Sequence, residues 1–252
     1  MGYEQMATVY DTFMNNAPYD KWLTLTEMLF KRNQSTIQSV LDIGCGTGQI
    51  TNRLAESGYH MVGVDSSEEM LSYAETKAHD RNLSVQWIHQ DVRYLEGLSS
   101  FDAVISYCDV MNYITTKEGL QLAFGNIYSA LNNGGIFIFD VHAMGHIQHH
   151  LADRTFADVT EDAAYIWFCE RGKKPGEVFH DLTFFIQNDR DTFERYSEGH
   201  HQRTYSVATY VQLLKEAGFE NCKIYADFDL NGDFNEGEAE RIFFLAHKRV
   251  TK

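Results

Sequence analysis

The stretch Val40–Ile50, VLDIGCGTGQI, decides the fold that this sequence predicts. Two apolar residues lead into an acid, and Gly44, Gly46 and Gly48 then follow at every second position. Because glycine has no Cβ, a chain this bare can approach a ligand closely where a first strand turns into a helix. The stretch therefore predicts a ligand-binding turn beside the carboxyl group of Asp42.

Short apolar runs and helical patterns alternate on both sides of this turn. Strands are expected at 37–43, 60–65, 84–92, 101–107 and 136–141, with helices between them. Most of these strands are continuous apolar runs, which is typical of strands covered on both faces. With two further strands at 221–229 and 241–249, the sequence predicts an α/β fold with a doubly wound, mostly parallel sheet of seven strands.

The alternation changes after about residue 152. Strand-like segments with turn signals between them occupy 165–172, 177–189 and 192–206. We therefore expect one α/β domain built from 1–151 and 206–252, with an N-terminal helical cap at 1–34. Residues 152–205 are expected to be an antiparallel β insertion that serves as a lid or as a dimerisation element.

Two patterns predict where helices begin. Ser66 with Glu69, and Thr115 with Glu118, have the spacing of a capping box, in which the first side chain caps the helix and the second reaches back. We expect helices to start at Ser66 and Thr115.

Composition and charge limit the classes of function. The chain has 252 residues, 44% of them hydrophobic, without a run of about 18 apolar residues that would cross a membrane. Its N-terminus does not resemble a secretory signal, and its four cysteines are far apart. A reduced, cytoplasmic setting is expected.

The formal net charge is −15, with 21 basic residues that form no cluster. Nucleic-acid backbones are bound by clustered Lys and Arg, so an RNA or DNA partner is disfavoured. Small acceptors that are neutral or cationic are favoured instead.

The acid at the end of the second strand suggests the ligand. Asp65 lies 21 residues beyond Gly44, a position suited to hydrogen bonds with ribose hydroxyls. The glycine spacing is G-x-G-x-G, not the G-x-G-x-x-G that receives a pyrophosphate, and Asp42 would disfavour a pyrophosphate while tolerating a cation. S-adenosylmethionine, a nucleoside with a sulfonium and no phosphate, fits better than a nicotinamide dinucleotide.

VLDIGCGTG, together with VGVDSS and HQDV, resembles the class I S-adenosylmethionine-dependent methyltransferases. The resemblance covers 37–141, and 206–247 fit the last helix and the reversed final hairpin of that family. It implies a set of cofactor-binding residues: Asp42, Gly44, Gly46 and Gly48 at the methionine end, Asp65 on the ribose hydroxyls, Met70 and Val92 beside the adenine, Asp91 on the adenine amino group, backbone at Tyr107 facing the ammonium, and Tyr10 over the methionine carboxylate.

Structural roles are the alternatives for the same residues. Asp42 suits a turn, Asp65 suits the cap of the following helix, and Met70 suits the core.

The acceptor is expected at the carboxyl edge of the sheet. Asp109, Asn112 and Tyr113 follow the fourth strand, in a segment without the Asn/Asp-Pro-Pro-aromatic motif used on nucleobase or glutamine nitrogens. Their alternative role is to start or support the next helix. His142 follows the fifth strand and is the candidate base or acceptor ligand, because the pKa of histidine suits neutral pH; a surface or helix-starting histidine is the alternative.

The segment GHHQRTYS near the end of the insertion provides further candidates. Antiparallel strands at this place are found in similar enzymes that methylate amino sugars. His200, His201, Arg203 and Tyr205 could point into the acceptor pocket, and Arg203 could pair with an anionic group. In a dimerisation element they would be solvated.

We expect no metal. HAMGHIQHH gathers four histidines at 142–150 but contains no Cys, Asp or Glu among them. DLNGDFNEGEAE, at 229–240, has acids at calcium-loop positions, yet Phe234 replaces the required glycine, so an acidic hairpin loop is expected.

The sequence therefore predicts an enzyme that transfers a methyl group from S-adenosylmethionine to N or O of a small molecule. An RNA methyltransferase and a cofactor-binding regulatory protein without turnover are the alternatives. A homodimer is expected only if the insertion mediates it.

Overall fold

The computed structural model describes residues 17–33, 36–188, 192–232 and 235–250. One sheet has seven strands, side by side in the order β10 (Phe219–Ala226), β11 (Arg241–Lys248), β5 (Leu131–His142), β4 (Phe101–Ser106), β1 (Ser39–Ile43), β2 (His60–Asp65) and β3 (Gln86–His89). A separate antiparallel sheet has four strands in the order β6 (Arg154–Val159), β7 (Ala163–Arg171), β8 (Glu177–Gln187) and β9 (Phe193–Arg203). The predicted fold class is confirmed.

The strand directions place several chain ends at one edge of the large sheet. Strands β1 to β5 pair in parallel, and only β11 runs antiparallel to its neighbours β5 and β10. The strand order reverses between β1 and β4, which is where ligands bind in open α/β sheets. Because β11 is reversed, its first residue, Arg241, lies opposite the last residue of β5, His142.

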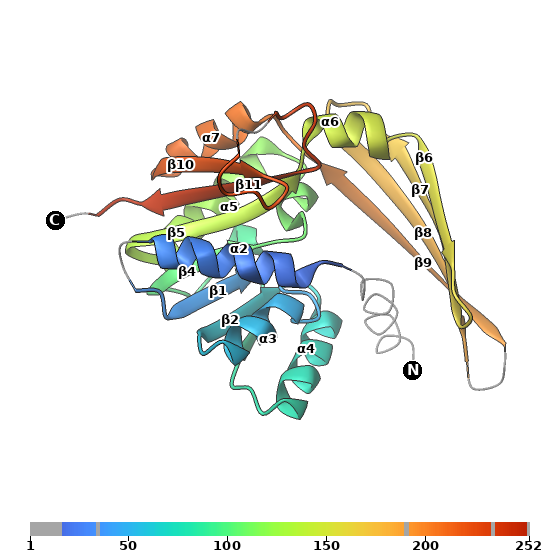
Figure 1. Ribbon diagram of the computed structural model, residues 1–252, viewed down its shortest axis with the longest axis horizontal. Coiled ribbons are helices and arrows are strands. Elements are labelled where there is room, and N and C mark those ends of the chain that lie inside the picture. The colour runs from blue at the N-terminus through green and yellow to red at the C-terminus, as the bar shows by residue number, and fades with distance from the viewer. Residues whose placement is uncertain (1–16, 34–35, 189–191, 233–234, 251–252) are drawn as a thin grey trace.

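Helices cover both faces of the sheet (Figure 1). On one face, α2 (Tyr19–Arg32) and α3 (Gln49–Glu56) pack on β1, β4, β5 and β11. On the other, α5 (Lys117–Ala130) and α7 (Val207–Glu216) pack on the same strands. A fifth helix, α4 (Glu68–Asp80), lies beside β2 and β3. Of the expected helical cap at 1–34, α2 is observed, and 1–16 lie outside the described residues.

The four-stranded sheet extends from the body as a curved arm, here called the lid (Figure 1). Short helical turns, α6 (Met144–His146) and Ile147–Leu151, lead into it from β5. Its first strand, β6, was missed by the sequence analysis because it is an exposed edge strand without apolar alternation. The acidic segment 229–240 follows β10 and leads into β11.

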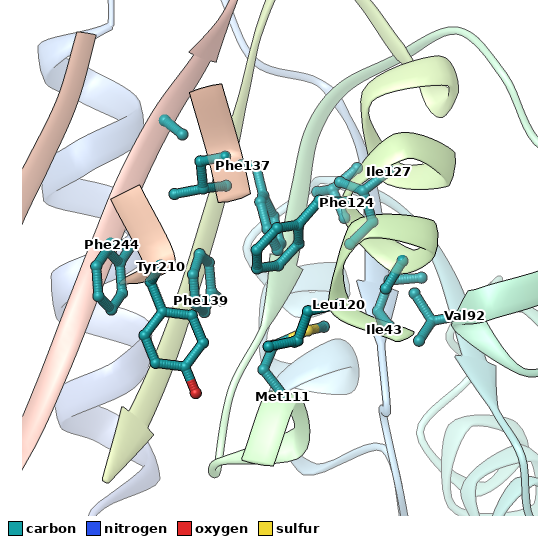
Figure 2. Packing of buried hydrophobic residues seen from close by; sticks show 14 of the residues in the cluster. Ile43, Val92, Met111, Leu120, Phe124, Ile127, Phe137, Phe139, Tyr210 and Phe244 are labelled. Atoms are coloured by element: carbon teal, nitrogen blue, oxygen red, sulfur yellow. The ribbon is translucent and has the colours of Figure 1, made fainter. Parts of the chain in front are cut away.

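Stacked aromatic rings fill the layer between the sheet and α5 and α7 (Figure 2). The rings of Phe137 and Phe139 in β5 stack 4.7 Å apart, and Phe139 stacks 4.7 Å from Phe244 in β11. Phe124 from α5 and Tyr210 from α7 close the layer. All five side chains are fully buried, so this layer fixes β5 and β11 side by side.

Both helix starts lie one residue beyond the predicted position. Ser67 caps α4 by accepting a hydrogen bond from the N–H of Met70, and Thr116 caps α5 in the same way from Gly119. Ser66 remains outside the helix, where its carbonyl contacts the ring of His89 at 2.9 Å. The backbone carbonyl of Thr115 accepts a hydrogen bond from the hydroxyl of Tyr205 at 2.8 Å. Tertiary contacts therefore shift each helix start by one residue.

Among the described residues, no helix is both long and apolar enough to span a membrane.

We expect Phe139→Ala to lower the free energy of unfolding by about 3–5 kcal/mol, because it removes a ring packed on every side. Phe193→Ala is the matched control, since that side chain is 54% exposed and should cost below about 1 kcal/mol. Chemical denaturation followed by fluorescence measures both. Equal losses would contradict the packing described here.

Candidate functional site

Two adjoining hollows lie at the carboxyl edge of the parallel strands, and both include Gly44. Both are open to solvent: the empty space in them, open solvent included, is ≈ 540 Å³ in the larger and ≈ 400 Å³ in the smaller. The predicted residues that line the larger hollow are Gly44, Asp65, Asp91, Val92 and Tyr113. Those that line the smaller hollow are Asp42, Gly44, Gly46 and Tyr107.

The three glycines are required for different reasons. All have positive φ, of 71°, 53° and 74° in chain order, which disfavours other residues. A Cβ on Gly44 would collide with Val110, and one on Gly48 would lie 2.8 Å from Trp87. Only at Gly46 is the Cβ position open, with nothing within 4 Å. Gly46 therefore leaves room for a ligand, whereas Gly48 caps α3 and lines neither hollow.

The Asp65 carboxylate joins the glycine turn to the start of α4. One oxygen accepts from the N–H of Gly46 at 2.8 Å, and the other accepts from the N–H of Ser67 at 2.9 Å. Burial raises the pKa of Asp65, although the backbone donors oppose that rise. Each carboxylate oxygen retains a lone pair, so Asp65 can accept further hydrogen bonds from ligand hydroxyls in the larger hollow.

Asp42 lies beneath the smaller hollow, and only 3% of it is exposed. The hydroxyl of Thr51 donates to it at 2.6 Å. Burial raises its pKa to about 7, and the nearby charge of Asp65 adds to the rise. A cation in the smaller hollow would favour the ionised form of Asp42, as expected for the methionine end of a sulfonium cofactor.

The remaining cofactor candidates occupy different surroundings. The Asp91 carboxylate lines the larger hollow but accepts from the guanidinium of Arg93, with Nε at 3.0 Å. Tyr107 lines the smaller hollow, and its hydroxyl lies 2.7 Å from Thr26 Oγ1. Met70 is half-buried and lines neither hollow. Tyr10 lies outside the described residues.

Sequence reasoning missed several lining residues. The larger hollow also includes Ser66, Gln90 and Val110, and the smaller includes Tyr19, Cys45 and Cys108. Ser66, Gln90 and Cys45 directly neighbour the motif residues, so the motif could have indicated them. Tyr19 comes from α2, and no local pattern marks it.

The turn after β4 is held in an uncommon backbone conformation. Cys108 and Asp109 both have positive φ, of 57° and 53°, which costs residues with a side chain about 1–3 kcal/mol each. Their N–H groups donate to the buried carboxylate of Asp140 at 3.3 and 2.7 Å. The hydrogen bonds from two consecutive backbone donors hold the Asp109 side chain at the edge of the sheet.

A buried guanidinium joins this turn to β5 and α2. Arg241 donates to Asp140 at 2.9 Å and to Asp109 at 3.0 Å. Its guanidinium lies 5.3 Å from the ring of Trp22, which itself donates to Asp140 at 2.5 Å. The sequence analysis missed Arg241, although a reversed last strand has to begin at this edge.

His142 lies beside the carboxylate of Asp109. Its Nε2 is 3.4 Å from Asp109 Oδ1, and its Nδ1 is buried without a hydrogen-bond partner in the part of the chain that the structure describes. Burial raises the pKa of Asp109, but the charges of His142 and Arg241 outweigh burial and hold it well below its usual range. The Asp109 carboxylate is therefore charged at neutral pH and faces both Arg241 and His142.

His146 stacks 5.5 Å from His142 and 5.6 Å from His150, and burial lowers the pKa of His146 to about 4. Within the described ranges, no three His, Cys, Asp or Glu side chains form a group that could hold a metal.

Asn112 and Tyr113 have different positions. Asn112 is fully buried: its oxygen accepts from the N–H of His142 at 3.0 Å, and its nitrogen donates to the carbonyl of Arg203 at 3.2 Å. It joins β5 to the lid and does not face a hollow. Tyr113 is 48% exposed, lines the larger hollow and contacts His200 at 3.2 Å.

Of the two adjacent histidines predicted to face the pocket, His200 contacts the body and His201 does not. His201 stacks 4.3 Å from the exposed ring of Phe179 and lies 3.2 Å from Glu177. Side chains alternate along a strand, so the neighbours of His201 point the other way. Gln202 donates to Asp109 at 2.8 Å, and His200 contacts Tyr113.

Arg203 is likewise not brought to the hollows. Its guanidinium lies 4.4 Å from the ring of Tyr205 and donates to the carbonyl of Pro175 at 3.3 Å.

Comparisons with known proteins agree with this geometry. A family model of the methyltransferase domain matches residues 40–135. The chain is similar to "Putative methyltransferase GWCH70_2453" of Geobacillus sp. (strain WCH70), with 39% identity over 249 residues, 98% of this chain and 100% of the relative. It is 38% identical over 252 residues to "Putative methyltransferase YqeM" of Bacillus subtilis (strain 168), over 100% of this chain and 99% of that relative.

Solved structures are similar over nearly the whole chain. An S-adenosylmethionine-dependent methyltransferase from Clostridium acetobutylicum ATCC 824 superimposes with a TM-score of 0.89 at 26% identity, covering 98% of this chain and 99% of that one. CalS10 of Micromonospora echinaspora, an amino pentose methyltransferase solved with S-adenosylmethionine, shares the fold, with a TM-score of 0.74 at 18% identity over 95% and 96% of the two chains. The glycine turn, the buried acids beside it and these full-length relatives together lead to one conclusion: the chain belongs to the class I S-adenosylmethionine-dependent methyltransferases.

Proposed function

We propose that this enzyme methylates N or O of a small molecule. The observation that carries the proposal is the contact between the lid and the end of the cleft, where Gln202 donates to Asp109 at 2.8 Å and His200 meets Tyr113. These contacts place the lid beside Tyr113, which lines the larger hollow. A small acceptor suits an enclosed site, whereas RNA needs an open, basic groove.

The residues beside the glycine turn fit the cofactor. Gly46 leaves open space, Asp65 can accept from ribose hydroxyls, and Asp42 lies where a positive charge would keep it ionised. When bound, S-adenosylmethionine supplies an electrophilic methyl group on a positively charged sulfur. The protein then has to hold the acceptor atom about 3 Å from that methyl group, and this positioning can supply much of the rate.

His142 is the proposed base for an acceptor that arrives protonated. A carboxylate only accepts hydrogen bonds, so Asp109 favours the proton on Nε2 of His142. The lone pair of a neutral ring then remains on Nδ1, which has no partner among the described residues. His142 lines neither hollow and Nδ1 is buried, so an acceptor N–H or O–H would reach Nδ1 only after neighbouring side chains move; it would then satisfy this atom and could give up its proton to it.

Two further observations support a small acceptor. The name of CalS10 describes a small-molecule substrate, an amino pentose, for a protein with the same fold. The net charge of −15 disfavours an RNA acceptor. The homodimer stays a prediction, and the exposed Phe168 and Phe179 on the lid are the surface that it would cover.

We expect label from methyl-labelled S-adenosylmethionine to enter small molecules. The protein is incubated with a pool of amines, amino sugars and phenols, and separately with total RNA, and S-adenosylhomocysteine is measured in each. Formation of S-adenosylhomocysteine only with the small-molecule pool supports the proposal. Label in RNA, or cofactor binding without turnover on any acceptor, would contradict it.

We expect His142→Gln to lower kcat by about 10²- to 10⁴-fold with little change in cofactor affinity, because it removes a proton acceptor. His149→Gln, at an exposed position, is the control. A variant that retains the wild-type rate would exclude His142 as the base.

A further inference from the structure

A row of hydrogen bonds crosses three neighbouring strands of the lid and ends on Asp109. The indole N–H of Trp167 in β7 donates to His180 Nδ1 at 2.9 Å. His180 Nε2 in β8 lies 3.1 Å from Gln202 Oε1 in β9, and Gln202 Nε2 donates to Asp109 Oδ2 at 2.8 Å. The three side chains share the face of the lid that is turned toward the body.

The chemistry of its two ends fixes the direction of this row. An indole N–H can only donate, and an ionised carboxylate can only accept. His180 must therefore carry its proton on Nε2, because Nδ1 accepts from Trp167. The carboxamide of Gln202 must then accept from His180 and donate to Asp109. No other arrangement of the protons satisfies every contact.

Burial makes the row costly to break. His180 is 7% exposed and Gln202 is 4% exposed, so a polar atom that lost its partner here would not regain one from water. An unpaired buried group is more costly than a hydrogen bond is stabilising. All three hydrogen bonds of the row form only while β9 contacts the turn after β4. We call this arrangement the seated lid.

The two carboxylate oxygens of Asp109 have different partners: one contacts the lid and the other contacts the body. Gln202 occupies Oδ2, and Oδ1 faces Arg241 at 3.0 Å and His142 at 3.4 Å. A carboxylate held at both oxygens cannot rotate. The lid therefore sets the angle at which Asp109 meets His142.

We propose that His180 and Gln202 are positioning residues that align the Asp109–His142 pair for proton transfer when the lid is seated. This inference rests on the proposed role of His142. It assigns the lid a part in the chemistry beyond covering the acceptor.

The electrostatics agree with a neutral His180. Burial lowers the pKa of His180 to about 4; among the charged groups that face it, His142 and His200 lower it further and Asp109 opposes them. A second proton on Nδ1 would also face the indole N–H, donor against donor.

The first test measures the tautomer of His180 and needs no methyl acceptor. Long-range ¹H–¹⁵N spectra of the imidazoles should show His180 as the neutral Nε2–H tautomer between pH 5.5 and 8. In Trp167→Phe, which removes the donor to Nδ1, this tautomer preference should weaken. A protonated His180, or an Nδ1–H tautomer in the wild-type protein, would overturn the proposed direction.

The second test measures the coupling with an acceptor from the small-molecule pool. Gln202→Met keeps the shape but cannot donate, and kcat should fall about 10- to 100-fold, as expected for losing a hydrogen bond to a charged group, with S-adenosylhomocysteine affinity unchanged. Gln202→Glu should have a similar effect, because its carboxylate repels Asp109. Thr183→Val, on the outward face of the lid, is the control.

In the His142→Gln background, Gln202→Met should cause little further loss, because the aligned partner is already gone. Full additivity, or an unchanged kcat in Gln202→Met, would overturn the positioning role. If His142→Gln alone leaves kcat unchanged, His142 is not the base. The imidazole spectra would still decide whether the row of hydrogen bonds exists.

Discussion

The buried guanidinium of Arg241, held between Asp109 and Asp140, is the interaction on which the proposed acceptor end of the cleft depends. It joins β11 to the turn after β4 and, through Trp22, to α2. Removing one partner of a buried ion pair leaves an uncompensated charge, which costs about 3–5 kcal/mol. The same oxygen of Asp109 that accepts from Arg241 lies 3.4 Å from Nε2 of His142.

The two ends of the cleft are built differently. The proposed cofactor end is mostly local: the glycine turn, Asp65 and Asp91 all lie within 40–92, and backbone N–H groups donate to both carboxylates. Only the smaller hollow adds distant residues, among them Tyr19 and Tyr107. The proposed acceptor end gathers side chains from α2, the turn after β4, β5, β9 and β11. Their positions depend on strand pairing across most of the chain, so this proposed site would form only in the complete fold with the lid in place.

This difference explains how much could be predicted from the sequence. The α/β fold, the mostly parallel sheet and the residues of the glycine turn follow from local patterns, and these predictions did not need the register of any distant strand. Arg241 and Gln202 were missed because their roles come from pairing: Arg241 lies opposite His142 only because β11 is reversed. The sequence also predicted that both His200 and His201 point into the pocket, although they lie on opposite faces of β9, because alternation alone does not say which face of a strand meets the body.

The most direct test of the account is a calorimetric titration with S-adenosylhomocysteine, with NADH titrated in parallel. The account predicts micromolar binding of S-adenosylhomocysteine that weakens about 10- to 100-fold in Asp65→Ala, as expected when hydrogen bonds to a charged group are lost, and that is unchanged in Glu69→Ala at an exposed position on α4. Tight binding of NADH, or S-adenosylhomocysteine affinity that does not respond to Asp65→Ala, would contradict the assignment of the glycine turn and its acids as the cofactor site.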